Sequence, residues 1–133
     1  MSGCVVDTDV VIAALDRSDA HHDAAAGGLK RMIRDNVPLL LSLINYAEAL
    51  VRPSDDERTM RVAIDAISAL DIRLLSPTPD VARDAARLRH LGISLADGFA
   101  LSAARSQDAA VASFDTRVRR AAEKIGIATA EIG

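Results

Sequence analysis

Aromatic side chains are scarce in this chain of 133 residues, which has two phenylalanines, one tyrosine and no tryptophan. That scarcity argues against base stacking on an aromatic platform as a way of binding nucleic acid. The single cysteine, Cys4, excludes an internal disulfide, and its apolar surroundings predict a small core residue instead of a nucleophile. Positive charge is not in excess either. The net charge of −3 excludes a generally basic, phosphate-binding surface, although it leaves room for a local basic patch.

Long apolar runs are also missing. No stretch approaches the roughly 20 apolar residues that a membrane-spanning helix needs, and no basic-then-apolar leader opens the chain. We therefore expect a soluble cytoplasmic protein. The length suits a single domain over residues 1–133. Half of the residues are apolar, which is enough for a core built from alanine, leucine, isoleucine and valine.

Short apolar stretches alternate with helical patterns along the whole chain. The first apolar stretch runs from Cys4 to Val6 and ends in Asp7, and a helical pattern follows at once. The predicted strands are residues 4–6, 39–41, 72–75 and 110–113, with a further edge strand at 127–129. The predicted helices are residues 9–16, 21–35, 43–51, about 60–70, 79–91, 95–105 and 115 or 116 to 125. This alternation predicts an α/β fold, a three-layer α/β/α sandwich around a central, mostly parallel sheet.

Four acidic residues stand in apolar surroundings, where carboxylates are seldom found unless they are paired or bind a metal. They are Asp7, Glu48, Asp97 and Asp115. Asp7 directly follows a predicted strand and Asp115 follows another one residue later, and ligands of parallel α/β sheets bind at the carboxyl ends of the strands. Carboxylates gathered there repel one another unless a cation neutralises them. Because ligands made of oxygen alone suit Mg²⁺ or Mn²⁺, the sequence predicts a site for one of these ions.

Simpler explanations exist for several of these residues. Glu48 has Arg52 four residues further on, which is the spacing of a helical ion pair. Asp115 fits the N-cap of the following helix, and Asp9 is better explained as an N-cap than as a ligand. The three histidines are interpreted as surface residues, which leaves no zinc site: His21, His22 and His90.

The ordered set of acids, with the residues around it, resembles the PIN-domain family and, within it, the VapC-type toxins of bacterial toxin–antitoxin pairs. The matching segments are Val5-Val6-Asp7-Thr8, Asn45-Tyr46-Ala47-Glu48, Leu95-Ala96-Asp97 and Ala112-Ser113-Phe114-Asp115. The resemblance spans essentially the whole chain. It implies an α/β/α fold and an Mg²⁺- or Mn²⁺-dependent endoribonuclease that cleaves RNA.

The resemblance also implies roles for individual residues. The catalytic, metal-binding set would be Asp7, Glu48, Asp97 and Asp115. Thr8 and Ser113 match small hydroxyl positions beside the family's site, whereas Asp9 departs from the neutral Ser or Asn that is common there. Partners implied by the family are a second copy of the chain, in a homodimer, and a small antitoxin protein. The nearest basic patch for RNA is Arg117, Arg119 and Arg120, for which a solvated helix face is the alternative explanation.

Two other functions fit parts of the sequence. The segment from Asp7 to Val11 also resembles the signature of haloacid-dehalogenase-like phosphatases, in which Asp7 would be the nucleophile and Asp9 the general acid. That family needs a lysine before a late acidic pair, and Lys30 and Lys124 are poorly placed for it. The second alternative is a non-catalytic binding module with the PIN fold.

Overall fold

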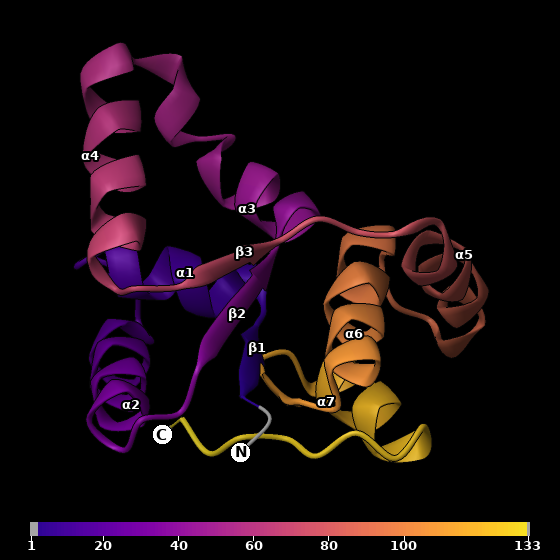
Figure 1. Ribbon diagram of the computed structural model, residues 1–133. Coiled ribbons are helices and arrows are strands. Elements are labelled where there is room, and N and C mark those ends of the chain that lie inside the picture. Colours follow the sequence, from indigo (N-terminus) through magenta and orange to yellow (C-terminus); the bar gives the residue numbers. More distant parts are fainter. Residues whose placement is uncertain (1–2, 133) are drawn as a thin grey trace.

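A four-stranded sheet forms the centre of the computed structural model, which describes residues 3–132 (Figure 1). All neighbouring strands are parallel, in the order β3-β2-β1-β4. The strands are β1 (Cys4–Val6), β2 (Leu39–Ser42), β3 (Arg73–Leu75) and β4 (Ala110–Ala112). The helices are α1 (Thr8–Leu15), α2 (His22–Arg34), α3 (Leu43–Leu50), α4 (Glu57–Ala69), α5 (Pro79–Arg87), α6 (Leu95–Gln107) and α7 (Thr116–Lys124), with short 3-10 helices η1 (Pro53–Asp55) and η2 (Leu88–Leu91).

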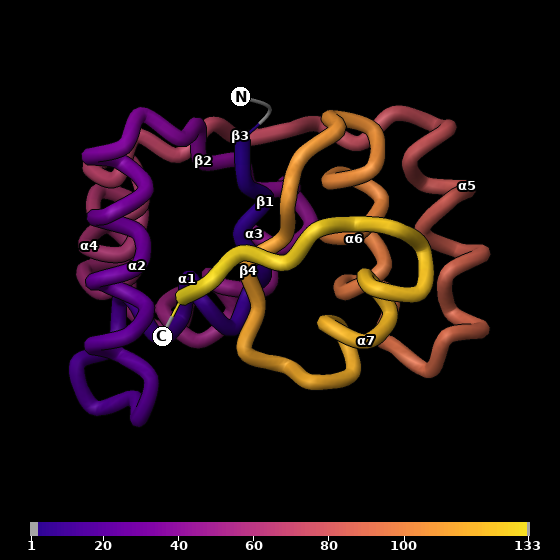
Figure 2. The backbone as a smooth tube through the Cα atoms, turned by 90° about the horizontal axis from the view of Figure 1, so that it is seen from below, coloured from indigo at the N-terminus to yellow at the C-terminus, as the bar shows by residue number. Residues whose placement is uncertain are grey.

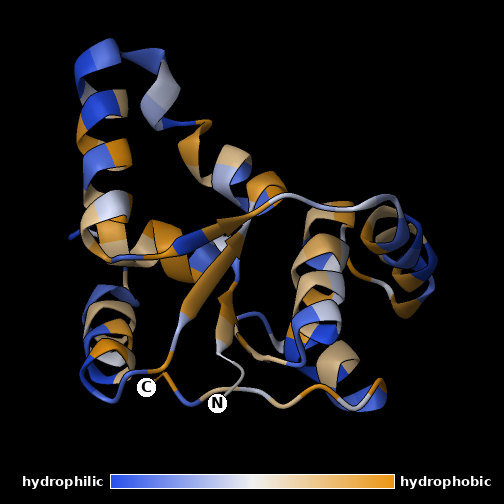
Figure 3. Ribbon diagram, viewed as in Figure 1, coloured by the Kyte–Doolittle hydropathy of each residue, from blue (hydrophilic) through white to orange (hydrophobic). Residues whose placement is uncertain are grey.

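Helices cover both faces of this sheet, so the predicted α/β fold is confirmed (Figure 2). Cys4 and Val6 of β1 pack with α1, α2, α3 and α4 on one face. Val5 points to the other face and packs with α6, α7 and η2. Because the central strands β1 and β2 are buried from both sides, their residues are almost continuously apolar, whereas the edge strand β3 begins with the exposed Arg73. Figure 3 shows the same division, with hydrophobic strands in the middle and hydrophilic outer faces on the helices.

Burial settles the role of Cys4. Its side chain is buried in the core between the sheet and the first helices. Burial also raises the pKa of the thiol to about 12, so the thiolate form is not available near neutral pH. The expected small core residue is confirmed. Among residues 3–132, no helix combines the length and the apolar character that crossing a membrane requires.

Most of the expected helix ends are confirmed by local capping. The Ser42 hydroxyl accepts from the amide of Ile44 at the start of α3, and the Thr78 hydroxyl does the same for α5, where Pro79 follows. Gly92 ends η2 with a φ of +79°, in the left-handed region that glycine adopts without strain. The helix boundaries are therefore encoded locally.

Two of the predicted element boundaries need correction. The first helix begins at Thr8 and its N-cap is Asp7, whose carboxylate accepts from the Thr8 amide, so the N-cap assignment of Asp9 is wrong. The predicted edge strand at 127–129 is reduced to one parallel bridge, between Val111 and Thr129. There the Val111 amide donates to the Ala128 carbonyl at 2.9 Å.

Candidate functional site

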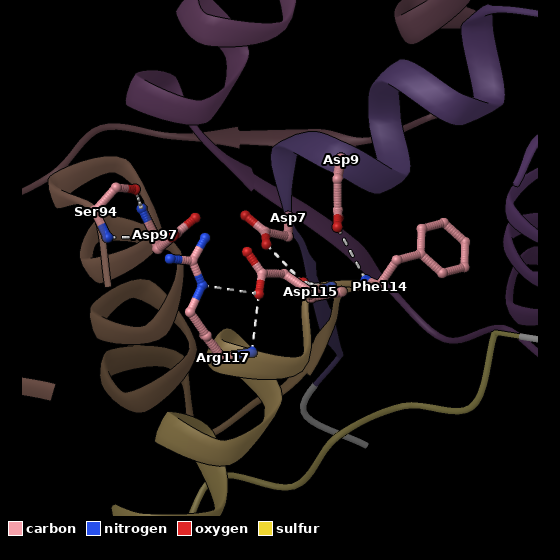
Figure 4. A network of polar contacts seen from close by, with 8 residues as sticks. Asp7, Asp9, Ser94, Asp97, Phe114, Asp115 and Arg117 are labelled. Atoms are coloured by element: carbon pink, nitrogen blue, oxygen red, sulfur yellow. Dashed lines mark hydrogen bonds and ion pairs between the residues drawn. The ribbon is translucent and has the colours of Figure 1, made fainter. Parts of the chain in front are cut away.

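The carboxyl ends of β1 and β4 lie side by side, and this brings together residues that are more than a hundred positions apart. Val6 pairs with Ala112, and the Asp7 amide donates to the Ala112 carbonyl at 2.9 Å. The next residue of each strand leads into the site. The Ser113 hydroxyl donates to Oδ2 of Asp7 at 2.7 Å. Figure 4 shows the resulting group of carboxylates, which come from α1, α6 and the start of α7.

Asp7 is the most buried of these acids, with 2% of its surface exposed. Its Oδ1 accepts from the Thr8 amide at 2.9 Å, so both carboxylate oxygens have a partner. The pKa of Asp7 is raised to about 7: burial is the main cause and the charges of Asp9 and Asp97 add to it, while the hydrogen bonds from Ser113 and Thr8 oppose the shift. The surroundings of Asp7 therefore destabilise the ionised form of its carboxylate.

Asp9 belongs to the same group, although its sequence position suggested only a cap or a supporting residue. Its Oδ2 accepts from the Phe114 amide at 3.1 Å, which joins the first turn of α1 to the loop after β4. Its Oδ1 is buried and has no hydrogen-bond partner among residues 3–132. Burial raises the pKa of Asp9, and the charges of Asp115 and Asp97 add to that effect. An unpartnered carboxylate oxygen among other acids is suited to a cation.

Asp97 is placed by the start of α6. It forms a capping box with Ser94: the Asp97 amide donates to the Ser94 hydroxyl at 3.1 Å, and the Ser94 amide donates to Oδ2 of Asp97 at 3.2 Å. The side chain is partly exposed, and its charge contributes to the raised pKa of both Asp7 and Asp9. Its capping role and its nearness to the other acids are therefore compatible.

Asp115 is the N-cap of α7, which is one of the two roles that the sequence suggested for it. Its Oδ1 accepts from the Arg117 amide at 2.8 Å and lies 3.7 Å from Arg117 Nε. Its own amide donates to the Ser113 hydroxyl at 3.1 Å. The Ser113 hydroxyl thus bonds to the Asp7 carboxylate and to the Asp115 amide at once, so the hydroxyl predicted to support the site links two of its acids.

Glu48 stands apart from this group. It is exposed on α3, and no hydrogen bond or ion pair joins it to the other acids or to Arg52 within residues 3–132. In the same part of the chain, no three acidic, histidine or cysteine side chains are close enough together to form a ready metal site. The structure therefore brings together Asp7, Asp9, Asp97 and Asp115, and leaves the metal-binding role of Glu48 a prediction.

Asn45 is a residue that sequence reasoning passed over. It lies one turn before Glu48 on α3 and is completely buried. Its Nδ2 donates to the Thr8 hydroxyl at 3.0 Å and to the Ala96 carbonyl at 3.1 Å, while its Oδ1 has no hydrogen-bond partner in the described part of the chain. It therefore joins α3 to the residues next to Asp7 and Asp97. The signal for such a role in the sequence was an amide side chain on the apolar side of a predicted helix.

The three predicted RNA-binding arginines are all exposed but do not share one surface. Arg117 faces Asp115 and the other acids (Figure 4). Arg119 and Arg120 instead line a hollow between α7 and the segment 127–129. A role in binding RNA remains a prediction for all three, and the geometry favours Arg117 as the one beside the acids.

The donor set fits a hard divalent cation. The acids offer only oxygen, one carboxylate oxygen of Asp9 is buried without a partner, and the pKa of Asp7 is raised by burial and by neighbouring negative charge. Each of these costs is lowered when a cation is bound, and oxygen ligands suit Mg²⁺ or Mn²⁺. No thiolate or imidazole contributes to the group, which does not favour zinc.

The sequence matches the PIN domain family over residues 4–124. This chain belongs to the PIN domain family. The match covers nearly the whole chain, so the resemblance seen in the ordered acids is confirmed. No curated protein sequence gives a significant match.

Several solved toxin structures share this PIN fold. The Mycobacterium tuberculosis toxin VapC20, described as cleaving the sarcin–ricin loop, is 21% identical over 90% of this chain and 95% of its own, with a TM-score of 0.72. FitAcB from Neisseria gonorrhoeae is 22% identical over 95% of both chains, with a TM-score of 0.71. VapBC2 from Rickettsia felis, bound to a DNA fragment from its promoter, is 16% identical over 96% of both chains, with a TM-score of 0.75. At these identities the likeness shows a shared fold.

Proposed function

We propose that this PIN domain, acting as one unit over residues 1–133, is a metal-dependent endoribonuclease and the toxin of a toxin–antitoxin pair in the cytoplasm. The observation that carries the proposal is that Asp7 and Asp9 are held near the charges of Asp97 and Asp115, with the pKa of Asp7 raised to about 7. Such a group is unfavourable by itself and becomes favourable when it binds a cation.

The residues have distinct parts in this proposal. Mg²⁺ or Mn²⁺ would be held by Asp7, Asp97 and Asp115, with Glu48 as the fourth acid of the family's set. When bound, the ion supplies a water of lowered pKa and stabilises charge on the phosphodiester. The Ser113 hydroxyl and the Thr8 amide fix the orientation of the Asp7 carboxylate. Arg117 adds positive charge beside the acids, which an RNA backbone requires in a protein of net charge −3.

Relatives with the same fold support the choice of substrate and partner. VapC20 is described as cleaving an RNA loop, and a Klebsiella pneumoniae relative was solved as a toxin–antitoxin complex. We extend these properties to this chain: RNA as substrate, a cognate antitoxin as protein partner, and a homodimer as its own assembly.

The phosphatase alternative has less support. A nucleophilic aspartate must reach its substrate, yet Asp7 is 2% exposed and both of its oxygens accept hydrogen bonds. Family membership also points away from that function. The non-catalytic module differs from our proposal in having no cleavage and no metal binding.

The proposal is tested by incubating the purified protein with RNA in Mg²⁺, in Mn²⁺ and in excess EDTA. We expect cleavage in either metal, none in EDTA, and none with Asp7→Asn. Asp23→Asn is the matched control, because Asp23 is an exposed acid in the first turn of α2. Undiminished cleavage in EDTA would contradict the metal mechanism. Hydrolysis of a generic phosphomonoester would favour the phosphatase, and neither cleavage nor metal binding would favour the non-catalytic module.

A further inference from the structure

Two rings stack directly beside the acidic residues. His21, the N-cap residue of α2, lies against Phe114, which sits between Ser113 and Asp115. The ring centroids are 4.3 Å apart and the planes differ by 13°. His21 is exposed and Phe114 is partly buried. Since Phe114 covers one face of the imidazole, the exposed area of His21 lies on its other face and its edges.

Both rings are fixed by their backbones. The Phe114 amide donates to Oδ2 of Asp9 at 3.1 Å, which ties the backbone of Phe114 to one of the acids. The His21 amide donates to the Asp19 carboxylate at 2.8 Å, and the His21 carbonyl accepts from Ala25 at 2.9 Å in the first turn of α2. The stack is therefore a preorganised surface held at a defined place beside the site.

The position of the stack complements that of Arg117. In Figure 4 the ring of Phe114 points away from Asp7, Asp97 and Asp115, on the side opposite Arg117. A nucleic-acid strand whose phosphate lies over the acids would meet a guanidinium group on one side and a ring on the other. The scarcity of aromatic residues excludes an extended platform, but one pair is enough for one base.

We propose that the exposed face of His21, supported from behind by Phe114, stacks on one nucleobase of the single-stranded RNA that crosses the acidic residues. This inference rests on the proposed function and names a further contact for its substrate. Every base has a π-face, so such a contact sets the position of the strand and gives little sequence preference. The competing role for the pair is a simple bridge between the α1–α2 and β4–α7 loops, and binding measurements separate the two roles.

The test uses a fluorescently labelled octaadenylate RNA, bound in Ca²⁺, which takes oxygen ligands as Mg²⁺ does. His21→Ala should weaken binding by about five- to a hundredfold, whereas His21→Phe should retain most of it because a ring remains. His90→Ala is the matched control, because His90 is an exposed histidine on η2. Melting curves check that each variant is folded.

A set of octaadenylates with one abasic nucleotide at each position identifies the stacked base. One abasic position should weaken binding to the wild-type protein as much as His21→Ala does, and should cause no further loss in His21→Ala. Equal binding by His21→Ala and wild type, no such position, or no wild-type binding would overturn the inference. Absence of cleavage with position-specific stacking intact would instead reject the proposed catalytic function alone.

Discussion

The β1–α1 junction and the β4–α7 junction have the same local design but different chemistry. In each, an apolar strand leads to an aspartate that is the N-cap of the next helix, although Asp7 follows β1 directly and Ser113 and Phe114 separate Asp115 from β4. Asp7 is 2% exposed and its pKa is raised to about 7 by burial. The side chain of Asp115 is 31% exposed and lies beside Arg117.

The difference follows from the place of each strand in the sheet. β1 has a strand on both sides, and α6 packs against both β1 and α3 near the junction. β4 has β1 on one side and only the single bridge to Thr129 on the other. The same short sequence pattern therefore produces a costly, buried carboxylate in one place and an ordinary cap in the other. Location at the centre of the sheet decides which of the two carboxylates is buried.

The largest expected effect is on catalysis. Asp7→Asn should lower kcat/KM for RNA cleavage by more than about a hundredfold, beyond the ten- to hundredfold typical of residues that only support a metal ligand. Asp115→Asn should lose less, since its amide oxygen still caps α7 and the site is more open there. Steady-state cleavage in saturating Mg²⁺ measures both. Equal losses at the two junctions would remove the distinction drawn here.

A second effect is on the pH dependence of stability without metal. Because the folded pKa of Asp7 is about 7 and its ordinary value is 3.8, the unfolded chain ionises first as pH rises. Asp7 should therefore cost stability progressively between about pH 4 and 7, reaching roughly 4 kcal/mol above that range. Asp7→Asn should lack this slope, so it should match or exceed wild type at pH 7 and above.

Urea unfolding in EDTA at several pH values measures that slope, with Asp115→Asn as the control that should keep it. An Asp7→Asn variant that is well below wild type in stability at pH 8 would show Asp7 to be a structural partner. The cost of losing one partner of a buried pair is roughly 3–5 kcal/mol, so the two outcomes have opposite signs.

Among substitutions of uncharged residues at the β1–α1 junction, Asn45→Ala should be the most destabilising. It removes donors to the Thr8 hydroxyl and the Ala96 carbonyl inside a fully buried site. The expected loss is about 2–3 kcal/mol in the free energy of unfolding, from unsatisfied polar groups and the space left behind. Glu48→Ala, exposed on the same helix, should change stability by less than about 0.5 kcal/mol. Similar values for the two variants would show that Asn45 does not hold the junction.

Ser113→Ala should have the smallest effect, a loss of about 1 kcal/mol in the free energy of unfolding. The substitution removes a single hydroxyl, which joins the two junctions by its hydrogen bonds to Asp7 and Asp115. The hydrogen bond from Ser113 lowers the pKa of Asp7, so its removal should raise that pKa further. Thermal unfolding and a carboxyl titration measure the two changes. Ser106→Ala is a control, because the Ser106 hydroxyl donates only to the Ala103 carbonyl of its own helix. An unchanged Asp7 titration in Ser113→Ala would contradict the hydrogen bond's role.

The fold could be predicted from sequence because its signals are local. Apolar strands such as Leu39–Leu41 and caps such as Ser42 and Thr78 mark the elements, and their alternation favours a parallel sheet. The edge strand was overestimated because its pairing depends on a neighbour that is distant in the sequence. Of the predicted residues 127–129, Thr129 alone forms a bridge within the range 3–132.

The site could be predicted only in part. Asp7 stood out as an acid directly after a buried strand, and the position of Asp115 followed the same rule. Asp9 was misassigned because two aspartates two positions apart offer the same cap, and the contact of Asp9 with Phe114, which is distant in the sequence, could not be foreseen. Asn45 was missed because its partners, Thr8 and Ala96, come from two other helices.

The most direct test of the account is a carboxyl ¹³C NMR titration of Asp7 in the metal-free protein, repeated with saturating Mg²⁺. We predict a pKa of about 7 without metal, because the carboxylate is buried among other negative charges. Mg²⁺ should lower this pKa by stabilising the ionised form. A pKa at or below the ordinary 3.8 that does not respond to Mg²⁺ would contradict the central claim that these acids form a cation site.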